Sequence, residues 1–102
     1  MEEKKFISVC KALGDNNRMK IVKMLRKGTL CANGILKSLD CSQPTLSYHM
    51  KLLCESGIVK ARKQGLWTFY TLDRKVADNF AAHIVNVCTP VEDVKKDEAA
   101  EK

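Results

Sequence analysis

Hydrophobic residues recur at helical spacing in three segments of this chain. Apolar side chains stand three or four positions apart in residues 5–13, 16–26 and 73–87, as they do on one face of an amphipathic helix. Asp15 or Asn16 can cap the second segment and Asp73 can cap the third, because their short side chains accept hydrogen bonds from the first free N–H groups of a helix. We therefore expect a helix in each of these ranges.

Residues 30–39 and 42–55 predict two further short helices joined by a tight turn. Ser42 is suited to cap the second of them, and Pro44 follows in the first turn, where its missing N–H matters little. Gly57 stands where the chain needs a left-handed residue to leave the helix. This arrangement is a helix-turn-helix.

The second helix of this pair has two different sides. Leu46, Met50 and Leu53 recur at i, i+4 and i+7 and predict a buried stripe, whereas His49 is expected to be a packed or capping residue rather than a ligand. The opposite side carries short hydrogen-bonding side chains and a lysine, which suits a helix lying in the major groove of DNA. The predicted DNA contacts on this helix are Ser42, Gln43, Thr45, Ser47, Tyr48 and Lys51.

After Gly57 the pattern changes from helical to strand-like. Residues 58–62 begin with β-branched side chains, residues 63–65 are expected to turn, and residues 66–72 alternate with aromatic residues and threonines. We predict a β-hairpin, or wing, whose tip reaches phosphates or the minor groove; an ordinary charged hairpin turn is the alternative. The predicted contacts near the tip are Arg62, Lys63 and Gln64.

Charge is distributed unevenly along the 102 residues, a length that fits one domain. Residues 1–91 hold 15 Lys and Arg against 7 Asp and Glu, a net charge of +8, and residues 92–102 hold 3 against 5, a net charge of −2. The basic part favours a polyanionic partner, although a solvated basic surface is the alternative. We predict a folded DNA-binding and dimerisation domain at 1–91 and a charged, disordered tail at 92–102.

The last predicted helix has a long apolar face that so small a monomer leaves without a partner. We therefore expect a homodimer in which this helix packs against the first one; the alternative is that it packs on its own core. The expected interface residues are Phe6, Val9, Val76, Phe80, Ile84 and Val87.

Several classes of protein do not fit the sequence. No apolar run approaches the roughly 20 residues of a membrane span, and the start lacks the apolar core of a signal peptide. We expect a cytoplasmic protein with no membrane partner, whose five cysteines are reduced thiols. There is no Ser/His/Asp set, carboxylate pair or phosphate-binding loop, so we expect neither an enzyme nor an organic cofactor.

The order of predicted elements resembles the ArsR/SmtB family of bacterial winged-helix repressors, over roughly residues 5–88. The resemblance implies a mainly α fold with a small β-hairpin, in which about five helices and a wing form a winged helix-turn-helix. It also implies a homodimer that binds a palindromic double-stranded DNA operator and leaves it when an effector binds. The wing sequence is similar to that of arsenic-responsive members. The segments that carry the resemblance are residues 12–22, 42–53, 55–59 and 62–70.

Arsenic-responsive members of the family place three cysteines at the start of the first helix of the helix-turn-helix. Trivalent arsenic and antimony require two or three thiolates, and only Cys31 keeps a thiol here, with Asn33 and Leu36 at the other two positions. That three-cysteine site is therefore absent as written. Other cysteines of the chain can complete a thiol site with Cys31; the alternative is that they are small buried hydrophobic residues. The candidate sensing residues are Cys31, Cys10, Cys88, Cys41 and Cys54.

Three hypotheses follow. The first is a dimeric repressor released by a thiol-directed effector, namely trivalent arsenic, antimony or a soft metal ion bound by cysteine thiolates. The second is the same module with a redox or persulfide switch, for which Cys10 and Cys88 on the two dimerising helices can meet across subunits. The third is a winged-helix protein–protein module without a DNA target. Zinc or nickel sensing on the last helix is not expected, because Phe80 stands where the first histidine of such a site would be.

Overall fold

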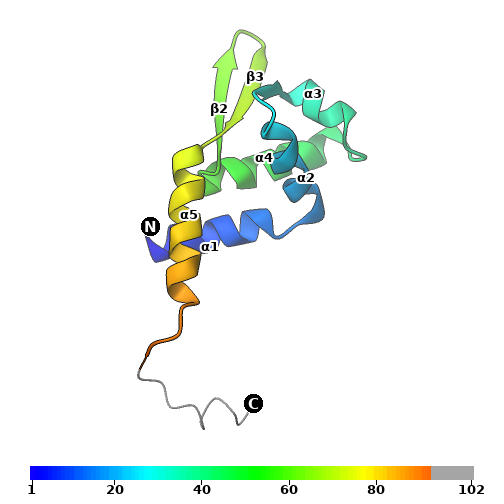
Figure 1. Cartoon of the computed structure of the whole chain (residues 1–102). Coiled ribbons are helices and arrows are strands. Elements are labelled where there is room, and N and C mark those ends of the chain that lie inside the picture. The colour runs from blue at the N-terminus through cyan, green and yellow to red at the C-terminus, as the bar shows by residue number, and fades with distance from the viewer. Residues whose placement is uncertain (93–102) are drawn as a thin grey trace.

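The structure is a computed structural model that describes residues 1–92; residues 93–102, which hold most of the predicted disordered tail, lie outside the described residues (Figure 1). Five helices and three short strands make up the described part. In chain order they are α1 (Glu3–Leu13), α2 (Asn16–Leu25), β1 (Leu30–Cys31), α3 (Ala32–Lys37), α4 (Gln43–Ser56), β2 (Val59–Gln64), β3 (Trp67–Leu72) and α5 (Arg74–Val87).

Side-chain caps begin α2 and α5 where the sequence predicted them. The carboxylate of Asp15 accepts a hydrogen bond from the backbone N–H of Arg18 at 3.1 Å, which identifies Asp15 as the cap of α2. Asp73 accepts from the N–H groups of Lys75 and Val76 and so begins α5. Both caps satisfy amide groups that have no partner inside the helix.

The first helix of the helix-turn-helix is shorter than predicted. Leu30 and Cys31 form strand β1 and pair with Tyr70 and Phe69 of β3, and α3 extends only from Ala32 to Lys37. The prediction of a helix over 30–39 was therefore wrong at both ends. The strand owes its hydrogen bonds to residues about forty positions later in the chain, and a local pattern of apolar residues does not carry that information.

The second helix, α4, forms as predicted. The Ser42 hydroxyl accepts from the backbone N–H of Thr45 at 3.3 Å, and Gly57 leaves the helix with φ +88°. Leu46, Met50 and Leu53 are all buried, with exposed fractions of 3% or less. The buried stripe therefore fixes which side of α4 faces away from the molecule.

The wing turns later than the sequence suggested. Strand β2 pairs with β3 from Val59 opposite Leu72 to Gln64 opposite Trp67, which leaves a two-residue connection at 65–66. Gly65 has φ +65°, which suits the first central position of a tight hairpin turn. Residues 63 and 64, predicted to turn, are paired strand residues instead. The sheet has the strand order β1-β3-β2.

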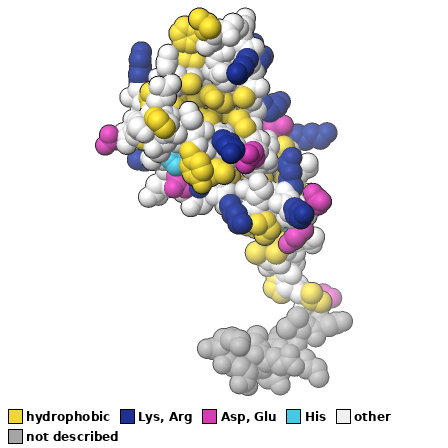
Figure 2. Space-filling model, turned by 180° about the vertical axis from the view of Figure 1, so that it is seen from behind, with side chains coloured by type: hydrophobic (Ala, Val, Ile, Leu, Met, Phe, Trp, Pro, Cys, Tyr) yellow, Lys and Arg dark blue, Asp and Glu magenta, His cyan; other side chains and the backbone are white. Residues whose placement is uncertain are grey.

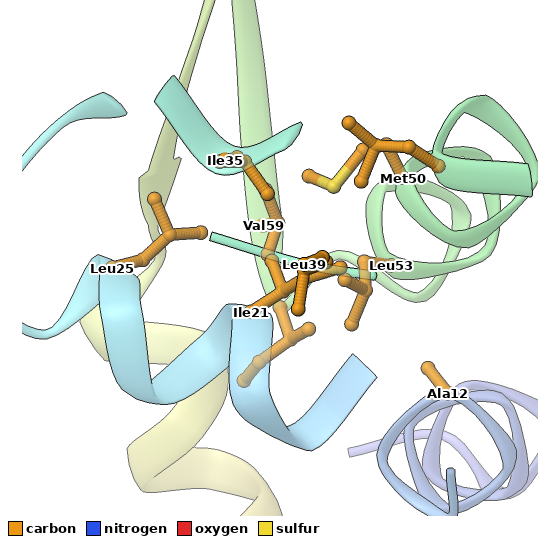
Figure 3. Packing of buried hydrophobic residues seen from close by; sticks show 10 residues of the cluster. Ala12, Ile21, Leu25, Ile35, Leu39, Met50, Leu53 and Val59 are labelled. Atoms are coloured by element: carbon orange, nitrogen blue, oxygen red, sulfur yellow. The ribbon is translucent and has the colours of Figure 1, made fainter. Parts of the chain in front are cut away.

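The core lies where α2, α3, α4 and the start of β2 converge, as Figure 3 shows. Side chains from elements far apart in the sequence meet there and hold the helix-turn-helix against the base of the wing. The buried residues of this cluster are Ala12, Ile21, Leu25, Ile35, Leu39, Leu46, Met50, Leu53, Ile58 and Val59.

Helix α5 crosses α1 at one side of the molecule and has no fully buried residue (Figure 1). Its Phe80 ring stacks on Phe6 of α1 with centroids 5.2 Å apart. Phe6 and Val9 are only 6% and 0% exposed, so their own chain already covers two side chains that the sequence assigned to a dimer interface. Val76 and Phe80, two further residues predicted for the interface, are half-buried.

Within residues 1–92, no helix has both the length and the apolar character that crossing a membrane requires.

Candidate nucleic-acid interface

The outward side of α4 presents the side chains that the sequence assigned to DNA contact. All of them are exposed, and Tyr48 is 58% exposed. The Ser42 hydroxyl, besides capping the helix, donates to the Thr45 hydroxyl at 3.0 Å, so these two side chains are already ordered at the start of α4. The exposed residues are Ser42, Gln43, Thr45, Ser47, Tyr48 and Lys51.

On the wing, Arg62 is held by two neighbours. Its Nη1 donates to Oε1 of Gln64 at 2.8 Å, and its guanidinium carbon lies 5.3 Å from the centroid of the Phe69 ring. Side chains alternate along a strand, so Arg62 and Gln64 share one face of the wing while Lys63 lies on the other. The wing can therefore bind one phosphate through the ordered guanidinium of Arg62 on one face, and another phosphate through the ammonium of Lys63 on the other face.

A hollow of about 420 Å³ lies between the start of α4 and the outer part of the wing. Gln43 and Ser47 line it from α4, and Trp67 lines it from β3. The tertiary structure thus brings together two regions that the sequence treated as separate contacts. Leu66 and Trp67, 102% and 53% exposed, are also at the tip of the wing, and we did not predict them as interface residues. The feature of the sequence that could have predicted their role in an interface is a pair of large apolar side chains next to the turn glycine Gly65.

The basic residues of this surface are free to meet an anion. Figure 2 shows Lys and Arg side chains on both edges of the part of the molecule that holds the wing. Among residues 1–92, no ion pair involves Lys51, Arg62 or Lys63. Nearby phosphates therefore need not displace an internal carboxylate from these three cations.

The five cysteines are dispersed rather than gathered. Cys88 is exposed and the other four are half-buried. Cys41 and Cys54 pack against the core cluster, and burial raises the pKa of the Cys54 thiol, which keeps that sulfur protonated and less reactive. Cys31 lines a hollow of about 490 Å³ together with Asn33 and Trp67.

A metal site of the family type does not fit a single chain. In the part of the chain that the structure describes, no three His, Cys, Asp or Glu side chains come close enough to hold a metal ion. Cys31 is also the residue immediately before α3 and the last residue of β1, rather than part of a helix. Within the described part of one chain, a thiophilic effector would therefore meet no more than two of these side chains, and a site of three would need side chains from two chains.

One exposed side of α5 is apolar. Ala81, Ile84, Val85 and Cys88 stand at i, i+3, i+4 and i+7, and all four are exposed, with Val85 at 65%. Figure 2 shows apolar side chains along this narrow part of the molecule. We call these four residues the α5 stripe. Of the predicted interface residues, Ile84 belongs to this stripe, and Val87 is also exposed.

Both the sequence and the fold are similar to those of known proteins. Residues 15–61 match the family described as "Bacterial regulatory protein, arsR family". The chain is 45% identical over 67 residues to an uncharacterised HTH-type transcriptional regulator of Methanocaldococcus jannaschii, covering 65% of this chain and 75% of that protein. It is 36% identical over 84 residues to an arsenical resistance operon repressor of Staphylococcus aureus, covering 82% and 81%.

The fold is similar to that of a homodimeric winged helix-turn-helix DNA-binding domain from Mycobacterium bovis, a possible ArsR-family transcriptional regulator. The two structures superpose with a TM-score of 0.68 at 27% sequence identity, covering 82% of this chain and 79% of that domain.

Proposed function

This chain belongs to the ArsR family of bacterial regulatory proteins, and from that membership we propose that it is a dimeric repressor released from a palindromic DNA operator by a thiol-directed effector. The family consists of DNA-binding transcriptional regulators and not of enzymes. The observation that carries the DNA part of the proposal is the exposed polar side of α4 beside the wing residues Arg62 and Lys63, which form no ion pair within residues 1–92.

The residues divide between reading bases and binding phosphates. Gln43 and Ser47 would contact base edges in the major groove, since a glutamine amide pairs with adenine through two hydrogen bonds. Lys51, Arg62 and Lys63 would contact phosphates, which supply affinity but no sequence choice. Two such surfaces related by a two-fold axis would meet successive major grooves about 34–36 Å apart.

The dimer part of the proposal rests on the α5 stripe. An exposed row of apolar side chains at helical spacing is what two helices of identical chains bury against each other in a symmetric dimer. The solved Mycobacterium bovis domain, which is homodimeric, supports a dimer for this chain.

Selection of duplexes from a random-sequence library by the purified protein tests DNA binding without knowledge of the operator. We expect a palindromic site whose binding weakens steeply as salt rises. Lys63→Ala should lower affinity for all sequences and reduce the logarithmic salt slope by about 1, and Gln43→Ala should relax base preference at one position. Lys4→Ala, on α1 and away from the wing in Figure 1, is the matched control that should leave the slope unchanged.

Failure to enrich any duplex, or binding that does not respond to salt, would contradict DNA recognition and favour a protein–protein module.

Titration of the complex with arsenite, antimonite, cadmium and hydrogen peroxide then tests the effector. We expect release by a thiophilic reagent, and loss of that release in Cys31→Ser or Cys88→Ser. Cys54→Ser should keep the release, because burial raises the pKa of the Cys54 thiol and disfavours the reactive thiolate. Release by peroxide alone would support a redox switch, and release by none of these reagents would defeat the thiol part only.

A further inference from the structure

One arginine side chain connects three helices behind the DNA-facing surface. Arg18 of α2 donates from Nε to the carbonyl oxygen of Ala12 at 2.8 Å and from Nη2 to that of Lys11 at 3.3 Å, at the end of α1. Its Nη1 lies 3.0 Å from Nδ1 of His49, in the middle of α4. His49 is only 7% exposed and Arg18 is half-buried, so this contact is partly shielded from water.

The chemistry of the pair determines the protonation state of His49. A guanidinium only donates hydrogen bonds, so Nδ1 of His49 must accept, and the ring must be neutral with its proton on Nε2. A protonated ring would present an N–H and a positive charge to the Arg18 guanidinium, and this contact would become repulsive. The contact therefore exists only while His49 is uncharged.

Asp15 is a second possible partner for the ring of His49 once that ring is protonated. The Asp15 carboxylate oxygen Oδ2 lies 4.0 Å from Nδ1 of His49 while it also accepts from the backbone N–H of Arg18. Tyr48 also faces this region, with its ring centroid 6.1 Å from that of His49. The other titratable groups are those that line the neighbouring hollow with Arg18 and Tyr48, namely Glu3, Lys4, Lys11 and Glu55. Gain of a proton would thus exchange Arg18 for Asp15 as the partner of His49.

We infer that Arg18 and His49 form a latch that positions the recognition helix α4 on α1 and α2, and that protonation of His49 opens it. His49 stands between Ser47 and Lys51, so a change in its partner acts within the turn of α4 that faces DNA. Recognition side chains must be held to within about 0.5 Å to read bases. Arg18 and His49 are positioning residues and do not themselves contact DNA; the DNA consequence rests on the proposed function.

The latch can be tested without DNA, by NMR of the imidazole nitrogens in the full chain. At about pH 8 we expect His49 with a protonated Nε2 and a bare Nδ1. As the pH is lowered until the imidazole nitrogens report a charged ring, we expect faster amide exchange in α4. A proton on Nδ1 at high pH, or α4 amides whose exchange ignores the charge of His49, would overturn the latch whether or not the protein binds DNA.

Protonation of His49 should change DNA affinity in the direction opposite to that of a histidine that contacts phosphates. A histidine close to phosphates strengthens DNA binding when it gains charge. This latch instead predicts binding of the selected duplex about tenfold weaker at the pH at which NMR reports a charged His49 ring than at about pH 8. His49→Asn places an amide oxygen at the position of Nδ1, accepts from Arg18 at any pH and should remove the pH dependence. His83→Asn, at the other histidine of the chain, should retain it.

Arg18→Lys keeps the charge but not the fork that reaches α1 and His49 together, so we expect affinity about tenfold lower at pH 8. Arg26→Lys, the same exchange at the exposed end of α2, should bind as the parent does. Equal pH dependence in the parent and in a folded His49→Asn protein would overturn the proposed effect on DNA. If no duplex is selected at all, the proposed function fails while the NMR result still decides the latch.

Discussion

At the scale of single residues, the backbone at the end of α4 depends on the absence of a side chain. Gly57 has φ +88°, and a Cβ there would lie 2.8 Å from Nζ and 2.9 Å from Cε of Lys5. A left-handed conformation also brings the Cβ of any other residue close to its own carbonyl oxygen. Gly34 differs, because it lies inside α3 with ordinary φ and only Cys31 Sγ, at 3.8 Å, near its added Cβ.

These two glycines make a matched pair for stability. Gly57→Ala should lower the free energy of unfolding by about 1–2 kcal/mol, because alanine is strained in the left-handed region. Gly34→Ala should raise it by about 0.5–1 kcal/mol, because alanine loses less backbone entropy in a helix. Urea denaturation followed by circular dichroism measures both. Equal effects of the same sign would contradict the backbone assignment at Gly57.

At the scale of elements, α4 has one end that serves both folding and binding. The Ser42 hydroxyl satisfies the N–H of Thr45, and it stands at the positive end of the helix dipole on the surface assigned to DNA. Stability and DNA affinity therefore depend on this position through different interactions. The cap needs an acceptor oxygen, whereas the DNA needs the absence of negative charge.

Two substitutions at Ser42 separate these requirements. Ser42→Ala should lower the free energy of unfolding by about 1 kcal/mol through loss of the cap. Ser42→Asp retains an acceptor, so it should keep stability within about 0.5 kcal/mol of the parent, yet bind the selected duplex at least about tenfold more weakly by repelling phosphates. Thermal unfolding and fluorescence anisotropy provide the two readouts. Unchanged DNA affinity in Ser42→Asp would remove this end of α4 from the interface.

At the scale of the whole molecule, α5 divides its apolar residues between two partners. Phe80 and His83 pack on Phe6 of the same chain, with His83 and Phe6 ring centroids 4.3 Å apart. The α5 stripe lies on another side of the helix and remains exposed. A single chain therefore covers one apolar side of α5, and a second copy of the chain is the proposed cover for the α5 stripe.

An aspartate in the α5 stripe tests that arrangement. Val85→Asp should weaken dimerisation at least about a hundredfold, because an unpaired charge would be buried between the two chains. Asn79→Asp adds the same charge to an exposed position of α5 outside the stripe and should leave the dimer intact. Sedimentation equilibrium of both variants decides. A dimer that tolerates Val85→Asp would place the interface elsewhere.

Local signals in the sequence were sufficient for α4 and for the caps of α2 and α5. A serine, a proline, a glycine and three leucine or methionine residues at helical spacing specify one helix without help from the rest of the chain, and the structure agrees on each of them. The same local chemistry placed the polar side chains of α4 outward. The family resemblance also rested on these segments, and the comparisons bear it out.

Only the tertiary structure decided the features that depend on partners distant in sequence. Strand β1 exists because β3 lies beside it, and Phe6 is covered because α5 crosses α1. The contact between Arg18 and His49 joins residues 31 positions apart, and no periodicity in the chain announces it. Hydrophobic spacing records which face of a helix is buried, but not whether its own chain or another copy buries it, since both remove the same apolar surface from water.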